Sequence, residues 1–204
     1  MKDKYLIKYS EEEGELVGIF AGDGSQYYYK KAGHYYTTIH FGDVPNYVRY
    51  VKKIYDSYFK KNWCVWKEIP KYGNPKYRIR VVDMTIFNHF LNYLSYDRKR
   101  KHDTVKLINF DFPDSFKIGF LRGFLDTDGT VANCKKRIRV QYYTTSKNLS
   151  KQISLFLSDL GINNGLCKIS RLKNKDIYYI YVLQGDVDSF LKLIKPYKGK
   201  WVGR

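Results

Sequence analysis

The stretch LVGIFAGDG at residues 16–24 decides the fold, because LRGFLDTDG at residues 121–129 repeats it. Leucine, glycine, aspartate and glycine match at the first, third, eighth and ninth positions of the two stretches. Each stretch predicts an apolar helix that ends in an aspartate, Asp23 or Asp128, followed by a glycine. This is an unfavourable place for a carboxylate, because the C-terminal end of a helix already carries partial negative charge. Both copies therefore need a positive partner at the end of the helix.

Small residues recur four positions apart in both stretches, as Gly18 and Gly22 in the first and as Gly123 and Thr127 in the second. Residues with this spacing lie on one face of a helix, and small side chains there let two helix backbones approach closely. A glycine inside a helix costs about 1 kcal/mol relative to alanine. We therefore predict that the two helices pack against each other and bring their terminal aspartates side by side.

A divalent cation would offset both the repulsion between these carboxylates and the negative helix ends. Oxygen ligands of this kind suit Mg²⁺, and metals that bridge attacking and leaving oxygens hydrolyse phosphodiesters. A single GDG is more often a helix cap followed by a turn, but two copies in matching positions favour a metal site. An EF-hand does not fit the second copy, because Val131 and Arg137 stand where glycine and glutamate are required. Asp126, whose counterpart is Ala21, is expected to be solvated or to form local hydrogen bonds rather than to bind metal.

The flanking sequence predicts the element order αββαββα twice, which indicates an α+β fold of two half-domains related by a pseudo-twofold axis. We expect an N-terminal half-domain at 1–97, a basic linker at 98–111 and a C-terminal half-domain at 112–204. Capping, periodicity and turn residues predict a helix from Ser10 to about Ala21, a helix at roughly 112–126 and a helix marked by Leu149 that ends at Gly161. Apolar residues at helical spacing mark three more helices, at 47–58, 86–94 and 187–194. Strands are predicted at 25–31, 33–41, 62–69, 76–82, 130–136, 137–143, 166–172 and 177–184.

The chain is strongly basic, with 37 Lys and Arg residues against 20 Asp and Glu residues and a formal charge of +17. The default partner of such a protein is nucleic acid. Alternation along the strands places Arg78 and Arg80 on one face of the first sheet, and Arg137, Arg139 and Gln141 on one face of the second. An ordinary solvated sheet face is the alternative, but the recurrence in both halves favours a nucleic-acid surface.

No stretch of 18 or more apolar residues indicates a membrane span, and the charged N-terminus does not resemble a signal peptide. Cys64, Cys134 and Cys167 lack the spacing of a disulfide framework or a zinc site. An intracellular location, cytoplasmic or organellar and at DNA, is expected.

The two stretches and the repeated element order resemble the single-chain, two-motif LAGLIDADG homing endonucleases over essentially the whole chain. The resemblance implies a monomer whose motif helices form the interface between half-domains, and whose antiparallel sheets form a saddle over double-stranded DNA. It implies that Asp23 and Asp128 bind Mg²⁺, with the backbone carbonyls of Gly22 and Thr127 in the metal shell. Mn²⁺ is expected to substitute, and Ca²⁺ to bind without supporting cleavage. The chain departs from the family at Ala21, Val17 and Arg122, none of which is the metal-binding position.

The family often places a basic residue just past the third helix of each half, which nominates Lys101 and Lys200 as supporting catalytic residues. Arg100 and Lys99 are equally good candidates for this role. The alternative for each of these basic residues is that it belongs to a solvated linker. His40, at the end of a strand, is a weaker candidate because a lone histidine is more often structural. Expected DNA contacts are Tyr27, Tyr29, Lys31, His40, Arg78, Arg80, Lys135, Arg137, Arg139, Gln141, Lys168 and Arg171.

Three functions are consistent with the motif, the fold and the basic charge. The first is a site-specific endonuclease that hydrolyses phosphodiester bonds at a long pseudo-palindromic DNA target. The second is an intron-encoded RNA maturase on the same fold, with intron RNA as its partner. The third, a non-catalytic DNA-binding regulator, is disfavoured because both aspartates are present. An endonuclease embedded in an intein is disfavoured because the first motif already begins at residue 16.

Overall fold

The computed structural model describes residues 7–134, 137–170 and 176–198. Within these ranges the chain forms two compact units, one containing residues 23–92 and the other residues 9–22 together with 93–198. This division differs from a simple halving of the chain, because nearly all of the first helix belongs to the second unit.

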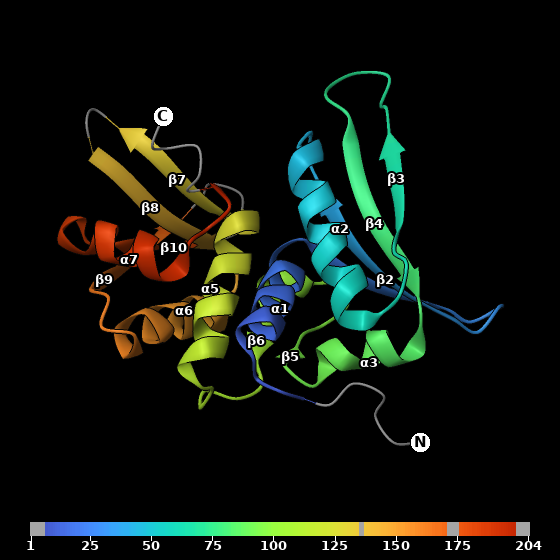
Figure 1. Cartoon of the computed structure of the whole chain (residues 1–204), viewed down its shortest axis with the longest axis horizontal. Coiled ribbons are helices and arrows are strands. Elements are labelled where there is room, and N and C mark those ends of the chain that lie inside the picture. The colour runs from blue at the N-terminus through green and yellow to red at the C-terminus, as the bar shows by residue number, and fades with distance from the viewer. Residues whose placement is uncertain (1–6, 135–136, 171–175, 199–204) are drawn as a thin grey trace. The chain divides into compact units, whose positions relative to one another are not determined.

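The first unit is a four-stranded antiparallel sheet with two helices (Figure 1). The strand order is β1-β2-β4-β3. The buried side chains of the sheet alternate with exposed ones, so Ile39, Ile79 and Val81 lie on its apolar face. The elements are β1 (Gly24–Tyr29), β2 (His34–Phe41), α2 (Pro45–Phe59), β3 (Cys64–Glu68), β4 (Lys76–Val82) and α3 (Met84–Leu91).

The second unit repeats this arrangement, with a four-stranded antiparallel sheet of order β7-β8-β10-β9. Helices α5, α6 and α7 contact this sheet (Figure 1). The elements are α1 (Glu11–Asp23, whose last residue is assigned to the first unit), β5 (Leu94–Ser95), α4 (Lys101–Thr104), β6 (Lys106–Leu107), α5 (Asp114–Asp128), β7 (Gly129–Cys134), β8 (Arg137–Thr144), α6 (Lys147–Asp159), β9 (Asn164–Ser170), β10 (Asp176–Val182), the 3₁₀ helix η1 (Gln184–Asp186) and α7 (Val187–Ile194).

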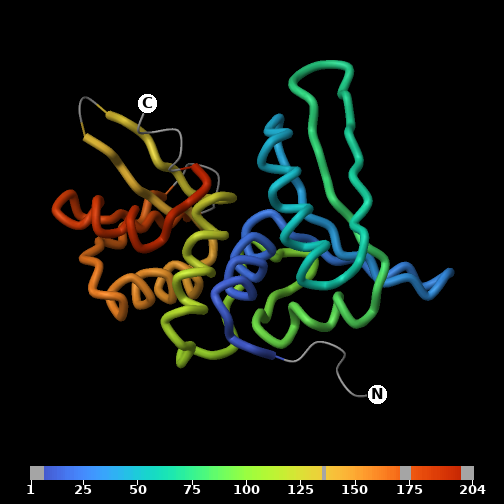
Figure 2. Tube along the Cα trace, in the orientation of Figure 1, coloured from blue at the N-terminus to red at the C-terminus, as the bar shows by residue number. Residues whose placement is uncertain are grey.

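Helices α1 and α5, which we call the motif helices, pack backbone to backbone as predicted; Figure 2 shows them side by side. A methyl group built on Gly18 would lie 2.3 Å from the carbonyl oxygen of Phe120. A methyl group on Gly123 would lie 2.2 Å from the carbonyl oxygen of Glu15. Gly14 and Gly119 make equally close approaches one turn earlier. The glycine face therefore extends further toward the N-terminus than the two repeated stretches indicate.

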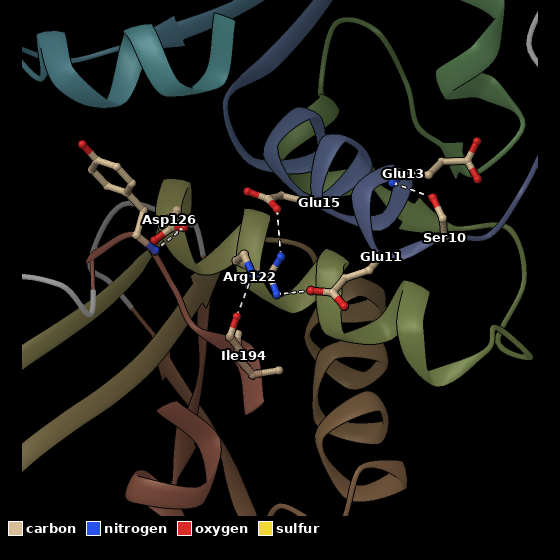
Figure 3. A network of polar contacts seen from close by, with 8 residues as sticks. Ser10, Glu11, Glu13, Glu15, Arg122, Asp126 and Ile194 are labelled. Carbon is tan, nitrogen blue, oxygen red and sulfur yellow. Dashed lines mark hydrogen bonds and ion pairs between the residues drawn. The ribbon is translucent and has the colours of Figure 1, made fainter. Parts of the chain in front are cut away.

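Polar contacts also tie the motif helices together (Figure 3). Arg122 ion-pairs with Glu11 and, at 3.0 Å, with Glu15, both on α1. Its Nε also donates a hydrogen bond of 2.7 Å to the carbonyl oxygen of Ile194 at the end of α7. The departure from a small residue at this motif position is thus explained by a guanidinium that connects three helices.

The predicted order of elements is confirmed, and the differences are local. Helix α1 begins after Ser10, whose Oγ accepts the N–H of Glu13 at 3.2 Å, and it continues to Asp23 rather than Ala21. The segment predicted as a linker at 98–111 contains α4 and β6, and β6 pairs with β5. Within the described residues, no helix has the length and apolar character needed to cross a membrane.

Candidate nuclease site and nucleic-acid interface

Asp128, the last residue of α5, is half-buried and lines a cavity of about 230 Å³. Polar side chains on the cavity wall also come from His102 on α4 and from Thr144 and Thr145 at the end of β8. Burial raises the pKa of the Asp128 carboxyl, although the charges of Lys101, His102 and Lys198 act to lower it. A carboxylate in this setting is stabilised by added positive charge.

A lysine ammonium binds the C-terminal end of each motif helix. Lys101 is buried, and its Nζ donates to the carbonyl oxygens of Phe20 at 2.8 Å and Gly22 at 2.9 Å. Lys198 Nζ donates to the carbonyl oxygens of Thr127 at 3.1 Å and Gly129 at 2.7 Å. The negative end of a helix favours such cations. Both lysines contact the carbonyl oxygen of the seventh motif residue, directly before the aspartate.

Asp126 holds the segment that carries Lys198. Its carboxylate is buried and accepts the backbone N–H of Tyr197 at 2.8 Å and of Lys198 at 2.9 Å. Burial raises the pKa of Asp126 to about 6, although the hydrogen bonds from Lys198 and Tyr197 act to lower it. The expectation of solvation or local hydrogen bonding is therefore wrong, because the carboxylate is buried and its partners lie 71 and 72 positions further along the chain. These bonds position a lysine at the motif end.

Asp23 directly follows Gly22 and is the last residue of α1. A methyl group built on Gly22 would lie 2.1 Å from Thr127 Oγ1 and 3.2 Å from Asp128 Oδ2. The end of α1 as far as Gly22 thus lies against the end of α5. The pairing of Asp23 with Asp128 stays a prediction. Across the described part of the chain, no three His, Cys, Asp or Glu side chains cluster as a metal site built from side chains alone.

The open face of the first sheet carries its predicted DNA-contacting strand residues. The register places Tyr27, Tyr29, His40, Arg78 and Arg80 on one face, opposite the apolar core. Lys31 lies in the turn between β1 and β2.

Neighbouring side chains orient the two arginines on this face. The Arg80 guanidinium lies 5.2 Å from the ring centre of Tyr36, and its Nε donates to Thr38 Oγ1 at 3.1 Å. The Arg78 guanidinium lies 6.0 Å from the ring of Trp66. Cation–π contacts of this kind favour one orientation of a guanidinium. On the same face, His40 Nε2 shares a hydrogen bond of 2.8 Å with Ser25 Oγ.

The second sheet has a matching face with Arg137, Arg139 and Gln141, which line a groove of about 410 Å³ with Tyr179 and Tyr181. Lys168 belongs to the opposite face, where its Nζ lies 2.8 Å from the carboxylate of Asp176. Lys135, Arg171 and Lys200 lie outside the described residues.

Sequence reasoning missed Lys198 and His102, whereas strand alternation already places Tyr143 on the same face as Gln141. The sixth motif residue is Ala21 in the first copy and Asp126 in the second. An extra buried carboxylate needs hydrogen-bond donors, and this difference between the copies was a signal for the segment that carries Lys198. His102 carried no comparable signal, since its proximity to Asp128 depends on the tertiary fold.

Comparisons with known proteins agree with this geometry. Residues 115–195 match the family model described as a LAGLIDADG-like domain. The homing endonuclease I-DmoI in complex with DNA and Mn superposes with a TM-score of 0.67 at 18% identity, covering 92% of this chain and 97% of that one. I-WcaI bound to its DNA recognition sequence gives 0.61 at 16% identity, with 94% and 84% covered.

A third similar structure is the N-terminal LAGLIDADG domain of DUF199/WhiA, with a TM-score of 0.60 at 17% identity and with 92% and 82% covered. No curated protein sequence matches. At these identities the structural likeness establishes the fold alone. Residues 115–195 thus match a LAGLIDADG-like domain, and the chain as a whole shares the fold of the homing endonuclease I-DmoI.

Proposed function

We propose that the chain is a site-specific double-stranded DNA endonuclease, acting as a monomer on a long pseudo-palindromic target. The observation that carries the proposal is the end of α5, where the half-buried Asp128 lines a cavity and a lysine ammonium binds the adjacent carbonyl oxygens. The basic open faces of both sheets support DNA as the substrate, as do the similar I-DmoI structures that contain DNA.

The oxygen atoms at the motif ends fit a divalent metal. Asp23 and Asp128 would hold it together with the carbonyl oxygens of Gly22 and Thr127, all hard donors of the kind Mg²⁺ prefers. Both carbonyl oxygens accept a hydrogen bond from a lysine ammonium, and each has a second lone pair that a metal would use. When bound, Mg²⁺ supplies Lewis-acid activation of a phosphoryl oxygen and of water. Similar I-DmoI structures contain Mn, Ca or Mg, which supports the binding of a divalent ion. We propose Mg²⁺ as that ion.

The other polar groups have supporting roles in this proposal. The ammonium groups of Lys101 and Lys198 compensate the carboxylate charge and attract the phosphate of the scissile bond. His102 and Thr145 line the cavity beside Asp128 and can hold water there. The oriented guanidiniums of Arg78 and Arg80 can contact base edges in the major groove, where arginine pairs bidentately with guanine.

Asp128→Asn and Asp23→Asn test the proposal. Each variant should lose cleavage of a duplex target selected from a random library in Mg²⁺, yet bind that target in Ca²⁺ as well as the unchanged protein does. Asp188→Asn, an exposed acid on α7, is the matched control and should cleave normally. Full cleavage by Asp128→Asn would refute the mechanism.

The same variants separate the endonuclease from the RNA maturase. A maturase would promote splicing of an intron RNA, and Asp128→Asn would not impair that activity. If the protein cleaved no member of the duplex library and promoted splicing of a cognate intron, the endonuclease proposal would be rejected in favour of the maturase.

A further inference from the structure

Gln141 occupies the centre of the second sheet's open face. It lies on β8, directly opposite Thr130 on β7 and Tyr181 on β10. It lines the groove of about 410 Å³ together with Arg137 and Arg139. Under the proposed function, on which this inference rests, this is a position from which a side chain reads a base edge in the major groove.

The amide of Gln141 is held by a neighbour on the same strand. The hydroxyl of Tyr143 donates a hydrogen bond of 2.7 Å to Gln141 Oε1. Tyr143 is half-buried and pairs across the sheet with Tyr179, whose ring centre lies 6.4 Å away. Tyr179 in turn lies 6.0 Å from Tyr181. The phenol ring is therefore fixed by an aromatic row, and its hydroxyl turns the amide oxygen along the strand.

This orientation decides which half of the amide is available to DNA. A glutamine side chain has one acceptor oxygen and an NH₂ group with two donors. Recognition of adenine uses both halves, since Oε1 accepts from N6 while Nε2 donates to N7. Guanine presents two acceptors, N7 and O6, and needs only donors. Because Oε1 accepts the hydrogen bond from Tyr143, the Nε2 donors are the part of the amide that remains available to a base.

We propose that Tyr143 is a positioning residue that makes Gln141 a reader of hydrogen-bond acceptors, so that the target carries guanine rather than adenine opposite Gln141. The tyrosine ring alone does not give this preference. A phenylalanine at residue 143 would keep the ring contact with Tyr179 but would leave the amide free to rotate. The hydroxyl thus acts through the glutamine and not through DNA itself.

Binding selection from a randomised duplex library in Ca²⁺ tests the inference. Gln141→Ala identifies the base pair that this residue reads, because the preference there should be lost while preferences elsewhere remain. At that base pair the unchanged protein should favour guanine over adenine by roughly tenfold. Tyr143→Phe should bring adenine to within about twofold of guanine. Tyr178→Phe, on the opposite face of the same sheet, is the matched control and should leave the profile unchanged.

Gln141→Glu supplies an independent test that leaves Tyr143 in place. A carboxylate only accepts, so the preference at this base pair should change from guanine to cytosine, which offers the N4 donor. Thermal unfolding of each variant identifies any that fails to fold.

An unchanged profile in Tyr143→Phe, or adenine selected by the unchanged protein at this base pair, would overturn the inference while leaving the proposed function standing. Absence of duplex binding by the unchanged protein would overturn both.

Discussion

At the scale of single residues, the charge of the motif ends is set by lysines as well as by carboxylates. Lys101 reaches the end of α1 from the short helix α4, whereas Lys198 reaches the end of α5 from the segment after α7. The two lysines come from different local structures, yet both contact the carbonyl oxygen before the motif aspartate. The shared requirement is a cation at the negative end of a helix.

Lys101→Met should destabilise the fold by about 2 kcal/mol, because two carbonyl oxygens lose a buried, charged donor. Urea unfolding monitored by tryptophan fluorescence measures this change. Lys106→Met, which removes an exposed lysine from β6, is the control and should shift the unfolding free energy by less than about 0.5 kcal/mol. Equal stability of Lys101→Met and the control would show that the buried contacts contribute little.

Asp126→Ala and Lys198→Met should each reduce cleavage, roughly a hundredfold, and the double variant should be no slower than either. The reason is that Asp126 acts through the backbone of Lys198, so removing both affects one function. Single-turnover cleavage rates measure this, with Lys192→Met as the control on an exposed face of α7. Multiplicative losses in the double variant would show that the two residues act separately.

At the scale of elements, the packing of the motif helices excludes side chains. Alanine normally stabilises a helix relative to glycine by about 1 kcal/mol. At Gly18 and Gly123 the sign should reverse, because the added methyl group meets the backbone of the partner helix. We expect each alanine variant to lose about 3 kcal/mol by overpacking, measured by urea unfolding. Gly42→Ala and Gly185→Ala, where the methyl group meets nothing within 4 Å, should be neutral within about 0.5 kcal/mol.

The sequence predicts this contact because glycine spacing directly reports how closely two helices approach. The hairpins were also predictable, since alternation and turn residues are local signals. The elements β5, α4 and β6 were not, because pieces of two to four residues are too short to show a period.

The family resemblance nominates Lys200, which lies outside the described residues, and does not nominate Lys198. The path of the chain after α7 depends on a left-handed residue, Lys195 with φ 51°, and on hydrogen bonds to Asp126. Neither feature is visible in the helical period, so spacing alone could not select the lysine that reaches the motif end.

Asp83 begins α3 and should make stability depend on pH. Burial raises the pKa of its carboxyl, but the hydrogen bonds from Ile86 and Thr85 and the ion pair with Lys61 outweigh burial, and the pKa falls below its ordinary value of 3.8. A lowered folded-state pKa stabilises the fold above pH 3.8, and this contribution is lost as the pH falls through the folded-state value.

Asp83→Asn keeps the helix cap but removes the charge, so the stability difference from the unchanged protein should be largest at neutral pH and vanish in acid. Unfolding free energies measured at several pH values between about 2 and 7 test this sign. A difference that grows in acid would contradict it. Asp83→Ala also removes the cap and should cost about 1 kcal/mol more at every pH.

At the scale of the whole molecule, the formal charge of +17 should make DNA binding strongly dependent on salt. Each lysine or arginine that contacts a phosphate releases condensed counterions, which lowers the slope of log K against log salt by about 0.9 per contact. A basic residue that faces only solvent does not change this slope. Salt dependence therefore distinguishes a DNA-contacting face from ordinary surface charge.

Arg137→Gln, on the open face of the second sheet, should reduce the magnitude of the salt slope by about 1 if its guanidinium contacts a phosphate. Arg49→Gln, an exposed arginine on α2 bonded to Asn46, is the matched control and should leave the slope unchanged. Fluorescence anisotropy with a labelled duplex from about 50 to 300 mM salt measures both, in Ca²⁺ so that the duplex stays intact. If Arg137→Gln weakened binding at one base pair while keeping the slope, its role would be base recognition instead. An equal fall of the slope in both variants would mean that the net charge attracts DNA without a defined binding face.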